Sequence, residues 1–96
     1  MIVMAGIGKT MELKKKILNE EGLHARPAGV FAKAAAGYQS KVEVVFNGRR
    51  INAKSSMSLM TLGLTKDSEF ELLIEGPDAE VALHQISQLI DLKFQV

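Results

Sequence analysis

The chain contains no cysteine and only two histidines, His24 and His84. Without cysteine it can form neither a disulfide framework nor a thiolate metal site, and two distant imidazoles with scattered carboxylates do not make a metal site either. We therefore expect no metal and no other cofactor. The lack of cysteine fits a reducing compartment, and we expect the protein to be cytoplasmic.

An excess of charge of one sign is also missing, because 12 basic and 11 acidic residues nearly cancel. This balance gives no general electrostatic reason to bind nucleic acid or an anionic membrane, so a partner must be recognised locally. Residues 1–10 are mildly apolar, but a bilayer span needs about 20 residues, and no basic stretch precedes them as in a signal peptide. We expect no membrane insertion and no export.

A chain of 96 residues with 47% apolar residues can bury one hydrophobic core, so we expect a single domain. Met11 stands just before the first strongly patterned segment. We interpret residues 1–10 as an N-terminal arm, an upstream start or a vector-derived remnant outside the fold, and residues 11–96 as the domain. The run from Gly6 to Thr10 resembles the end of a nucleotide-binding loop, but that motif needs a glycine where Val3 stands.

Periodicity and turn residues divide the domain into strands and helices. Residues 25–36 are alanine-rich with apolar residues at helical spacing, and Asn47 with Gly48 gives a strong hairpin signal. Residues 79–94 repeat apolar side chains at spacings of three and four. We expect strands at 13–18, 41–46, 49–53 and 69–75, and helices at 25–36, between Ser55 and Gly63, and at 79–94. This β-α-β-β-α-β-α order predicts an α+β open-faced sandwich, a four-stranded antiparallel sheet with three helices on one face.

His24 stands at the boundary where a loop becomes the helix of residues 25–36. The first backbone N–H groups of a helix have no internal partner, and the helix dipole makes that end positive, so an anion is stabilised there. A phosphoryl group on the imidazole would lie among these donors, Arg26 could hold its oxygens, and Gly22 would let the loop approach closely. In the alternative interpretation, His24 merely begins the helix and Arg26 is a solvated charge.

The segment Gly22–Ala28 resembles the active-site motif of HPr, the histidine-containing phosphocarrier of the bacterial phosphoenolpyruvate:sugar phosphotransferase system. Asn52–Leu64 resembles the second signature of that family, and the similarity covers Met11 to Phe94. The resemblance implies an HPr-like fold, with His24 as the phosphorylated residue and Arg26 as its phosphate-stabilising neighbour. It also implies a carrier in sugar transport that takes the phosphoryl group from enzyme I and passes it to sugar-specific IIA domains.

The same resemblance places Ser55 on the family's regulatory serine, which an ATP-dependent HPr kinase/phosphorylase phosphorylates in low-GC Gram-positive bacteria. Ser55 is also the expected N-cap of the short helix, where a phosphate would face free N–H groups. Met57 and Met60, one turn apart, form either an exposed apolar patch that several partners share or part of the core. A regulatory role in catabolite repression would add the kinase and the catabolite-control repressor as partners.

Two residues depart from the family pattern. Glu21 places a carboxylate near the histidine, where it should repel an incoming phosphate, and Ser56 stands where a larger apolar residue is usual. The alternative function is a regulatory HPr paralogue, of the catabolite-repression or the nitrogen type, that acts mainly as a binding module. We expect a carrier phosphorylated by partner enzymes and no enzyme, since beyond His24 the sequence offers no acid/base couple and His84 is interpreted as a solvated residue.

Overall fold

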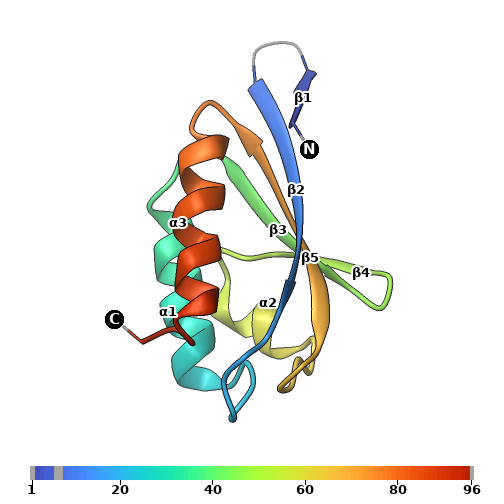
Figure 1. Cartoon of the computed structure of the whole chain (residues 1–96), viewed down its shortest axis with the longest axis vertical. Helices are drawn as coiled ribbons and strands as arrows, with labels where there is room; N and C mark the ends of the chain where they lie inside the picture. The colour runs from blue at the N-terminus through green and yellow to red at the C-terminus, as the bar shows by residue number, and fades with distance from the viewer. Residues whose placement is uncertain (1, 6–7, 96) are drawn as a thin grey trace.

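The computed structural model of the chain describes residues 2–5 and 8–95 (Figure 1). Its strands are β1 (Ile2–Ala5), β2 (Gly8–Lys16), β3 (Lys41–Phe46), β4 (Arg49–Asn52) and β5 (Glu69–Gly76), and its helices are α1 (Ala25–Ala36), α2 (Ser56–Met60) and α3 (Ala79–Asp91). From β2 onward these elements follow the predicted β-α-β-β-α-β-α order. The bounds of α1 and β3 agree with the sequence pattern residue for residue.

The strands form one antiparallel sheet in the order β1-β2-β5-β3-β4. Along β5 the side chains alternate: Phe70, Leu72 and Ile74 are buried, whereas Glu69 and Glu75 are exposed on the opposite face. The helices lie on the buried side of the sheet, and the charged side is open (Figure 1). Together with the three helices, β2, β5, β3 and β4 confirm the predicted four-stranded open-faced sandwich.

Residues 2–5 and 8–10, which the sequence pattern did not assign to the domain, pair with this sheet. β2 begins at Gly8 and pairs with β5 from Lys9 onward, and β1 pairs with β2 as an additional outer strand. Residues 1, 6 and 7 lie outside the described part of the chain. A short apolar run shows no period that would mark it as a strand, and only pairing along β2 brings it into the sheet.

The core lies between the helices and the sheet. The four apolar residues with predicted helical spacing in α1, which are Ala28, Phe31, Ala32 and Ala35, are all buried. The largest fully buried side chains include Phe31, Ile17, Leu59, Leu72, Ile74, Ile86, Ile90, Val42 and Val44. Three of the four α1 core positions are alanines, so this helix can approach its neighbours closely, and Phe31 is the one large side chain among them.

The turn between β3 and β4 is the predicted hairpin turn. Its two residues, Asn47 and Gly48, both have positive φ, 52° and 79°. A turn with two positive φ values matches the twist of the strands that it joins. β4 ends at Asn52, one residue earlier than predicted, although the Ala53 N–H still donates a hydrogen bond to the Val42 carbonyl at 2.9 Å.

α3 ends at Asp91, earlier than the predicted Phe94. Lys93 and Phe94 take left-handed backbone conformations, with φ of 60° and 61°. Phe94 nevertheless reaches the core, where its ring stacks on Phe31 of α1 with 5.7 Å between the ring centroids. The helical spacing of Phe94 therefore predicted its burial correctly, but the prediction that the helix continues to Phe94 was wrong.

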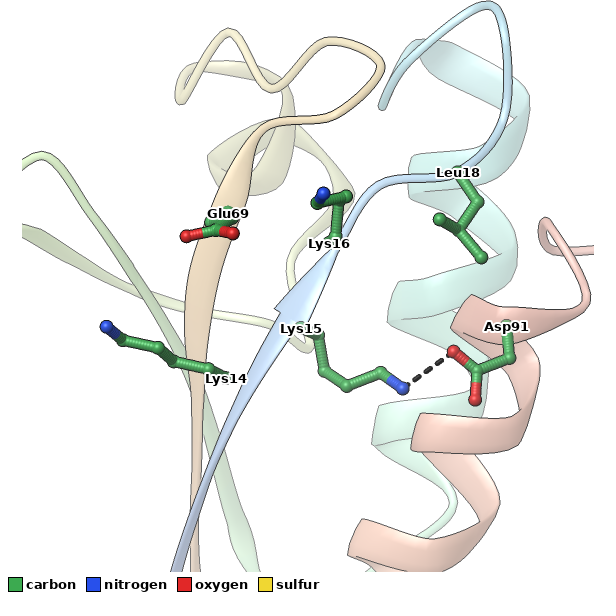
Figure 2. A pocket seen from close by; sticks show the side chains of 6 residues that line it. All are labelled: Lys14, Lys15, Lys16, Leu18, Glu69 and Asp91. Atoms are coloured by element: carbon green, nitrogen blue, oxygen red, sulfur yellow. Dashed lines mark hydrogen bonds and ion pairs between the residues drawn. The ribbon is translucent and has the colours of Figure 1, made fainter.

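An ion pair joins β2 to the end of α3. Lys15 Nζ lies 2.6 Å from Asp91 Oδ1, and the side chain of Lys15 is only 13% exposed. In Figure 2 Lys15 points toward α3, whereas Lys14, the preceding residue of the strand, points away from it, as strand alternation requires. This contact fixes the last helical residue of α3 against the sheet.

Candidate functional site

His24 is the N-cap residue of α1, with backbone angles of φ −83° and ψ −168°. Its carbonyl accepts a hydrogen bond from the Ala28 N–H at 2.8 Å, while its imidazole makes no capping bond and is exposed. The N–H groups of Ala25 and Arg26 have no helix carbonyl four residues before them, and Pro27 has no N–H to satisfy. The structure thus confirms His24 at the helix start, with a free imidazole at the positive end of the helix.

A glycine and a long-range hydrogen bond fix the loop that precedes His24. Gly22 has a φ of 73°, and a Cβ at this position would lie 2.6 Å from the Leu64 carbonyl oxygen. The Leu23 N–H donates to the same carbonyl at 2.9 Å. Only a residue without a side chain allows this approach, which confirms the close approach predicted for Gly22. The loop is thereby tied to the segment that follows α2.

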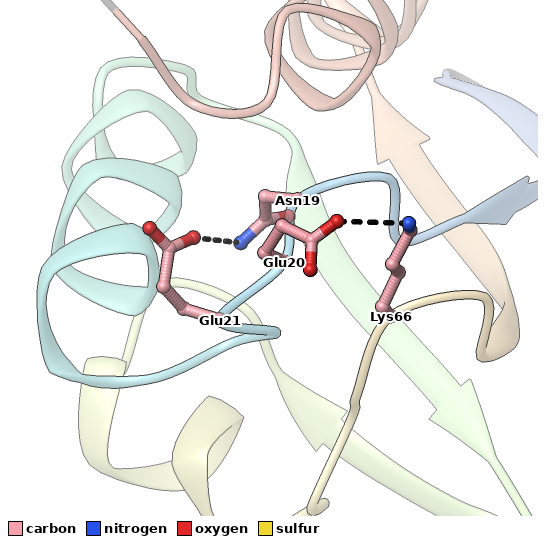
Figure 3. Close-up of polar contacts among 4 residues, drawn as sticks. All are labelled: Asn19, Glu20, Glu21 and Lys66. Carbon is pink, nitrogen blue, oxygen red and sulfur yellow. Dashed lines mark hydrogen bonds and ion pairs between the residues drawn. The ribbon is translucent and has the colours of Figure 1, made fainter.

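Asn19 holds the same loop from inside; the sequence pattern indicated a turn at residues 19–22 but not the burial of this side chain. Its side chain is buried, and Nδ2 donates to the Gly22 carbonyl at 2.6 Å. Nδ2 also donates to Glu21 Oε1 at 3.4 Å (Figure 3). The Gly22 N–H donates in turn to the Asn19 carbonyl at 3.1 Å. Asparagine commonly closes turns, which is the one signal that the sequence carried. Asn19 therefore positions the loop and draws the Glu21 carboxylate toward itself.

His24 opens into a hollow of about 910 Å³ that is lined by the loop, the start of α1 and the C-terminal tail. We call it the histidine hollow. Its charged and titratable lining residues are Glu20, Glu21, His24, Arg26 and Lys93. The structure therefore brings the predicted residues His24 and Arg26 together with Glu21, and it adds Glu20 and Lys93, for which the sequence suggested no role.

The two carboxylates of the histidine hollow have different partners. Glu20 accepts a hydrogen bond from Lys66 Nζ at 2.9 Å, and this bond, reinforced by the Lys66 charge, lowers the pKa of Glu20 (Figure 3). The same contact raises the pKa of Lys66. Glu21 lines the hollow close to the histidine in sequence, as expected, and its contact is with Asn19. An incoming anion therefore meets two acidic side chains as well as the cationic ones.

The protein family is shown by comparison with known proteins. A family model described as PTS HPr component phosphorylation site matches residues 11–91. The chain belongs to the HPr family. The phosphocarrier protein HPr of Treponema pallidum (strain Nichols) is 42% identical to it over 80 residues, which is 83% of this chain and 91% of that protein. The chain is thus a phosphocarrier protein of the phosphotransferase system.

Solved structures of HPr-family proteins share the fold. HPr-C-His from Thermoanaerobacter tengcongensis superposes with a TM-score of 0.84 at 38% sequence identity, covering 88% of this chain and 94% of that chain. Crh, the catabolite repression protein of Bacillus subtilis, was solved as a domain-swapped dimer. It superposes with a TM-score of 0.70 at 32% identity, covering 84% of this chain and 93% of that chain. The HPr-like fold implied by the sequence is confirmed.

The second HPr signature forms a capped short helix with an exposed edge. Ser55 is the N-cap of α2, as predicted, and its Oγ accepts a hydrogen bond from the Ser58 N–H at 3.2 Å. Met57 and Met60 are 75% and 40% exposed, whereas Leu59 is buried. The two methionines, which we call the methionine patch, are therefore surface residues and not part of the core.

Other candidate residues lie outside the histidine hollow. His84 is exposed on α3, as expected, and Ser56 is the half-buried first residue of α2. Among the residues that the structure describes, no group of three or more histidine, aspartate or glutamate side chains could hold a metal ion. No helix within residues 2–5 and 8–95 is long and apolar enough to cross a membrane.

Proposed function

We propose that the chain accepts a phosphoryl group from enzyme I on His24 and passes it to sugar-specific IIA domains, with residues 11–96 as the carrier domain. The observation that carries this proposal is the exposed imidazole at the N-cap of α1, which makes no capping bond. Family membership supports the same assignment, because the matching family is described by a phosphorylation site and the match covers residues 11–91.

The proposed chemistry is a displacement at phosphorus with the imidazole as nucleophile. A ring nitrogen of neutral His24 attacks the phosphoryl group on enzyme I, so that the nitrogen–phosphorus bond forms as the donor's bond to phosphorus breaks and one imidazole proton is released. Transfer to a IIA domain reverses these steps and returns the neutral imidazole. The phosphoryl group carries about two negative charges, so both transfers need positive charge and N–H donors beside the ring.

Arg26 is the residue that we propose to stabilise the phosphoryl group. It lies in the first turn of α1, two residues after His24, and it lines the histidine hollow. A guanidinium group can donate two parallel hydrogen bonds to phosphoryl oxygens, while the N–H groups of Ala25 and Arg26 supply uncharged donors at the helix end. The guanidinium group and the two backbone N–H groups would share the charge that develops during transfer.

Mass spectrometry after incubation with phosphoenolpyruvate and enzyme I tests this proposal. We expect one added phosphoryl group that acid removes and that a IIA domain discharges. His24→Ala should abolish the label, and the matched control His84→Ala should keep it, because His84 lies on α3 and does not line the hollow. A label that persists in His24→Ala would sink the assignment of His24.

A regulatory function at Ser55 is the second proposal, and the likeness to Crh, a catabolite repression protein, favours it. HPr kinase/phosphorylase would transfer the γ-phosphoryl group of ATP to Ser55 Oγ, with release of ADP and a proton. The Oγ already accepts a hydrogen bond from the Ser58 N–H, so a phosphate added to it would lie next to the N–H donors at the start of α2. The methionine patch, Met57 and Met60, would be the surface shared by the kinase, the catabolite-control repressor, enzyme I and the IIA domains.

Incubation with the kinase and ATP tests the second proposal. We expect an acid-stable phosphoryl group that Ser55→Ala loses and that the neighbouring control Ser56→Ala retains. The double variant with Met57→Ser and Met60→Ser should weaken binding of the kinase, because it removes exposed apolar surface. An unsubstituted protein that takes up no acid-stable label would refute the regulatory function and leave the carrier function of His24 in place.

A further inference from the structure

The C-terminal tail leaves α3 through a strained turn. The Lys93 N–H donates to the Ile90 carbonyl at 3.0 Å and the Phe94 N–H donates to the Leu89 carbonyl at 2.9 Å, which is the hydrogen-bond pair of a Schellman motif. The left-handed residue that begins the exit from this motif is usually glycine, but here it is Lys93, with a φ of 60°. A residue with a side chain held in this backbone conformation is a reason to look for a function.

Contacts on both sides fix this turn. Before it, the Asp91 carboxylate accepts a hydrogen bond from Lys15 at 2.6 Å (Figure 2). After it, Phe94 is buried, and its ring stacks on Phe31 at an interplanar angle of 26°. Phe31 belongs to α1, the helix that begins after His24. The turn is therefore held against the same helix that presents the proposed phosphoryl acceptor.

Lys93 lines the histidine hollow together with His24 and Arg26. Among the described residues neither Lys93 nor Arg26 takes part in an ion pair. The hydrogen bond and the charge of Lys66 have the largest effect in lowering the pKa of Glu20, and the charge of Lys93 lowers it further. The charge of Lys93 therefore reaches the hollow, which Glu20 also lines. The hollow thus contains two unpaired cations beside an imidazole, together with the carboxylates of Glu20 and Glu21.

We propose that Lys93 is a further phosphate-binding residue of the carrier site, whose ammonium group pairs with phosphoryl oxygens on His24 during transfer. This inference rests on the proposed function of His24. A phosphoryl group adds a charge of about −2 to a hollow that Glu20 and Glu21 already line. Arg26 supplies only one positive charge against it. Lys93 supplies the second. As the nitrogen–phosphorus bond forms and the donor's bond breaks, Lys93 neither gives nor takes a proton.

The strain at Lys93 gives this proposal a sharp test, because glycine removes both the strain and the charge. In Lys93→Gly the melting temperature should stay equal or rise, since glycine adopts the left-handed backbone without cost. The initial rate of phosphoryl transfer from enzyme I should fall roughly tenfold, the usual effect of losing one charge-assisted hydrogen bond. A lysine with a merely structural role would give the gain in stability without the loss of rate.

Two companion variants separate charge from shape. Lys93→Arg keeps a cation in the histidine hollow and should retain most of the transfer rate. Lys33→Met is the matched control, because it removes an exposed cation from the last turn of α1, at the opposite end of the helix from His24. Its transfer rate should equal that of the unsubstituted protein. A slow Lys33→Met would mean that overall charge, and not Lys93, sets the rate.

A second readout follows the phosphoryl group itself. After chemical phosphorylation of His24, phosphorus NMR gives the pKa of the phosphoryl group, which a nearby ammonium lowers; Lys93→Gly should therefore raise it while Glu20, Glu21 and Arg26 remain in place. An unchanged rate and an unchanged phosphoryl pKa in Lys93→Gly would overturn the role of Lys93. Failure of the unsubstituted protein to take up an acid-labile label would instead overturn the proposed function of His24.

Discussion

Replacing Gly22 by alanine probes the contact between the histidine loop and the segment after α2. Alanine at a φ of 73° costs about 1–2 kcal/mol for the left-handed backbone alone. Its Cβ would also lie 2.6 Å from the Leu64 oxygen and 2.9 Å from the Thr65 Cα, so the loop has to move away from a backbone that cannot yield. That movement breaks the hydrogen bond from Leu23 to Leu64, which is worth about 1 kcal/mol. We expect Gly22→Ala to lower the free energy of unfolding by about 2–3 kcal/mol.

Gly63→Ala is the matched control for this prediction. Gly63 has a φ of 69°, but no atom of the described residues lies within 4 Å of an added Cβ, so only the backbone cost of about 1–2 kcal/mol applies. Urea unfolding followed by circular dichroism measures both variants. The transfer rate from enzyme I, measured well below the unfolding transition, should fall only in Gly22→Ala, because that loop positions His24. Equal losses of stability in the two variants would refute the reasoning.

Three further changes test other parts of the molecule. Arg26→Ala should slow phosphoryl transfer at least about tenfold with little change in the unfolding midpoint, since the side chain is exposed; an unchanged rate would remove Arg26 from the site. Asn19→Ala leaves the Gly22 carbonyl without its partner and should cost about 1–3 kcal/mol in urea unfolding, and a cost near zero would contradict the positioning role. Hydrogen bonds, first from the Ser40 hydroxyl and then from the backbone, lower the pKa of Asp78 from 3.8. The stabilisation of the folded state by these bonds is therefore present above pH 3.8 and is lost as the pH falls through the lower folded-state pKa. Asp78→Asn should therefore reduce the loss of stability between roughly pH 5 and pH 2, which urea midpoints at the two pH values would show.

The parts of the molecule that depend on neighbouring residues could be predicted from the sequence. Residues 25–36 form α1 because their apolar side chains repeat at helical spacing. The Asn47-Gly48 turn and the Ser55 cap depend on backbone chemistry within four residues. His24 and Arg26 lie at one helix start, so no tertiary contact was needed to place them together.

The rest depends on contacts between distant segments. Phe94 keeps helical spacing with Ile90, and no local pattern shows that the chain instead turns after Asp91 and sends the ring to Phe31. Residues 2–5 form a strand only by pairing with β2, so a short apolar run could not be distinguished from an arm.

The roles of Asn19 and Lys93 in the site also depend on how the chain packs. Asn19 is a plausible turn residue anywhere in a loop, and its role depends on burial beneath the loop of Gly22. Lys93 is one lysine among several in the sequence, and it reaches the histidine hollow only because Phe94 is anchored on α1. Charged residues near a site can be recognised in sequence only when they share its helix or loop.

The order of the strands has a consequence for how the chain acquires its shape. β5 lies between β2 and β3, yet it is the last of the described strands to leave the ribosome. Until then β2 and the β3-β4 hairpin have no common partner, and pairs such as Thr10 with Glu75 close a loop of most of the chain length. Folding is therefore a late, cooperative event that follows synthesis of residues 69–76. We expect a nascent chain stopped before Glu69 to be a target for proteases and chaperones and not a partly working carrier.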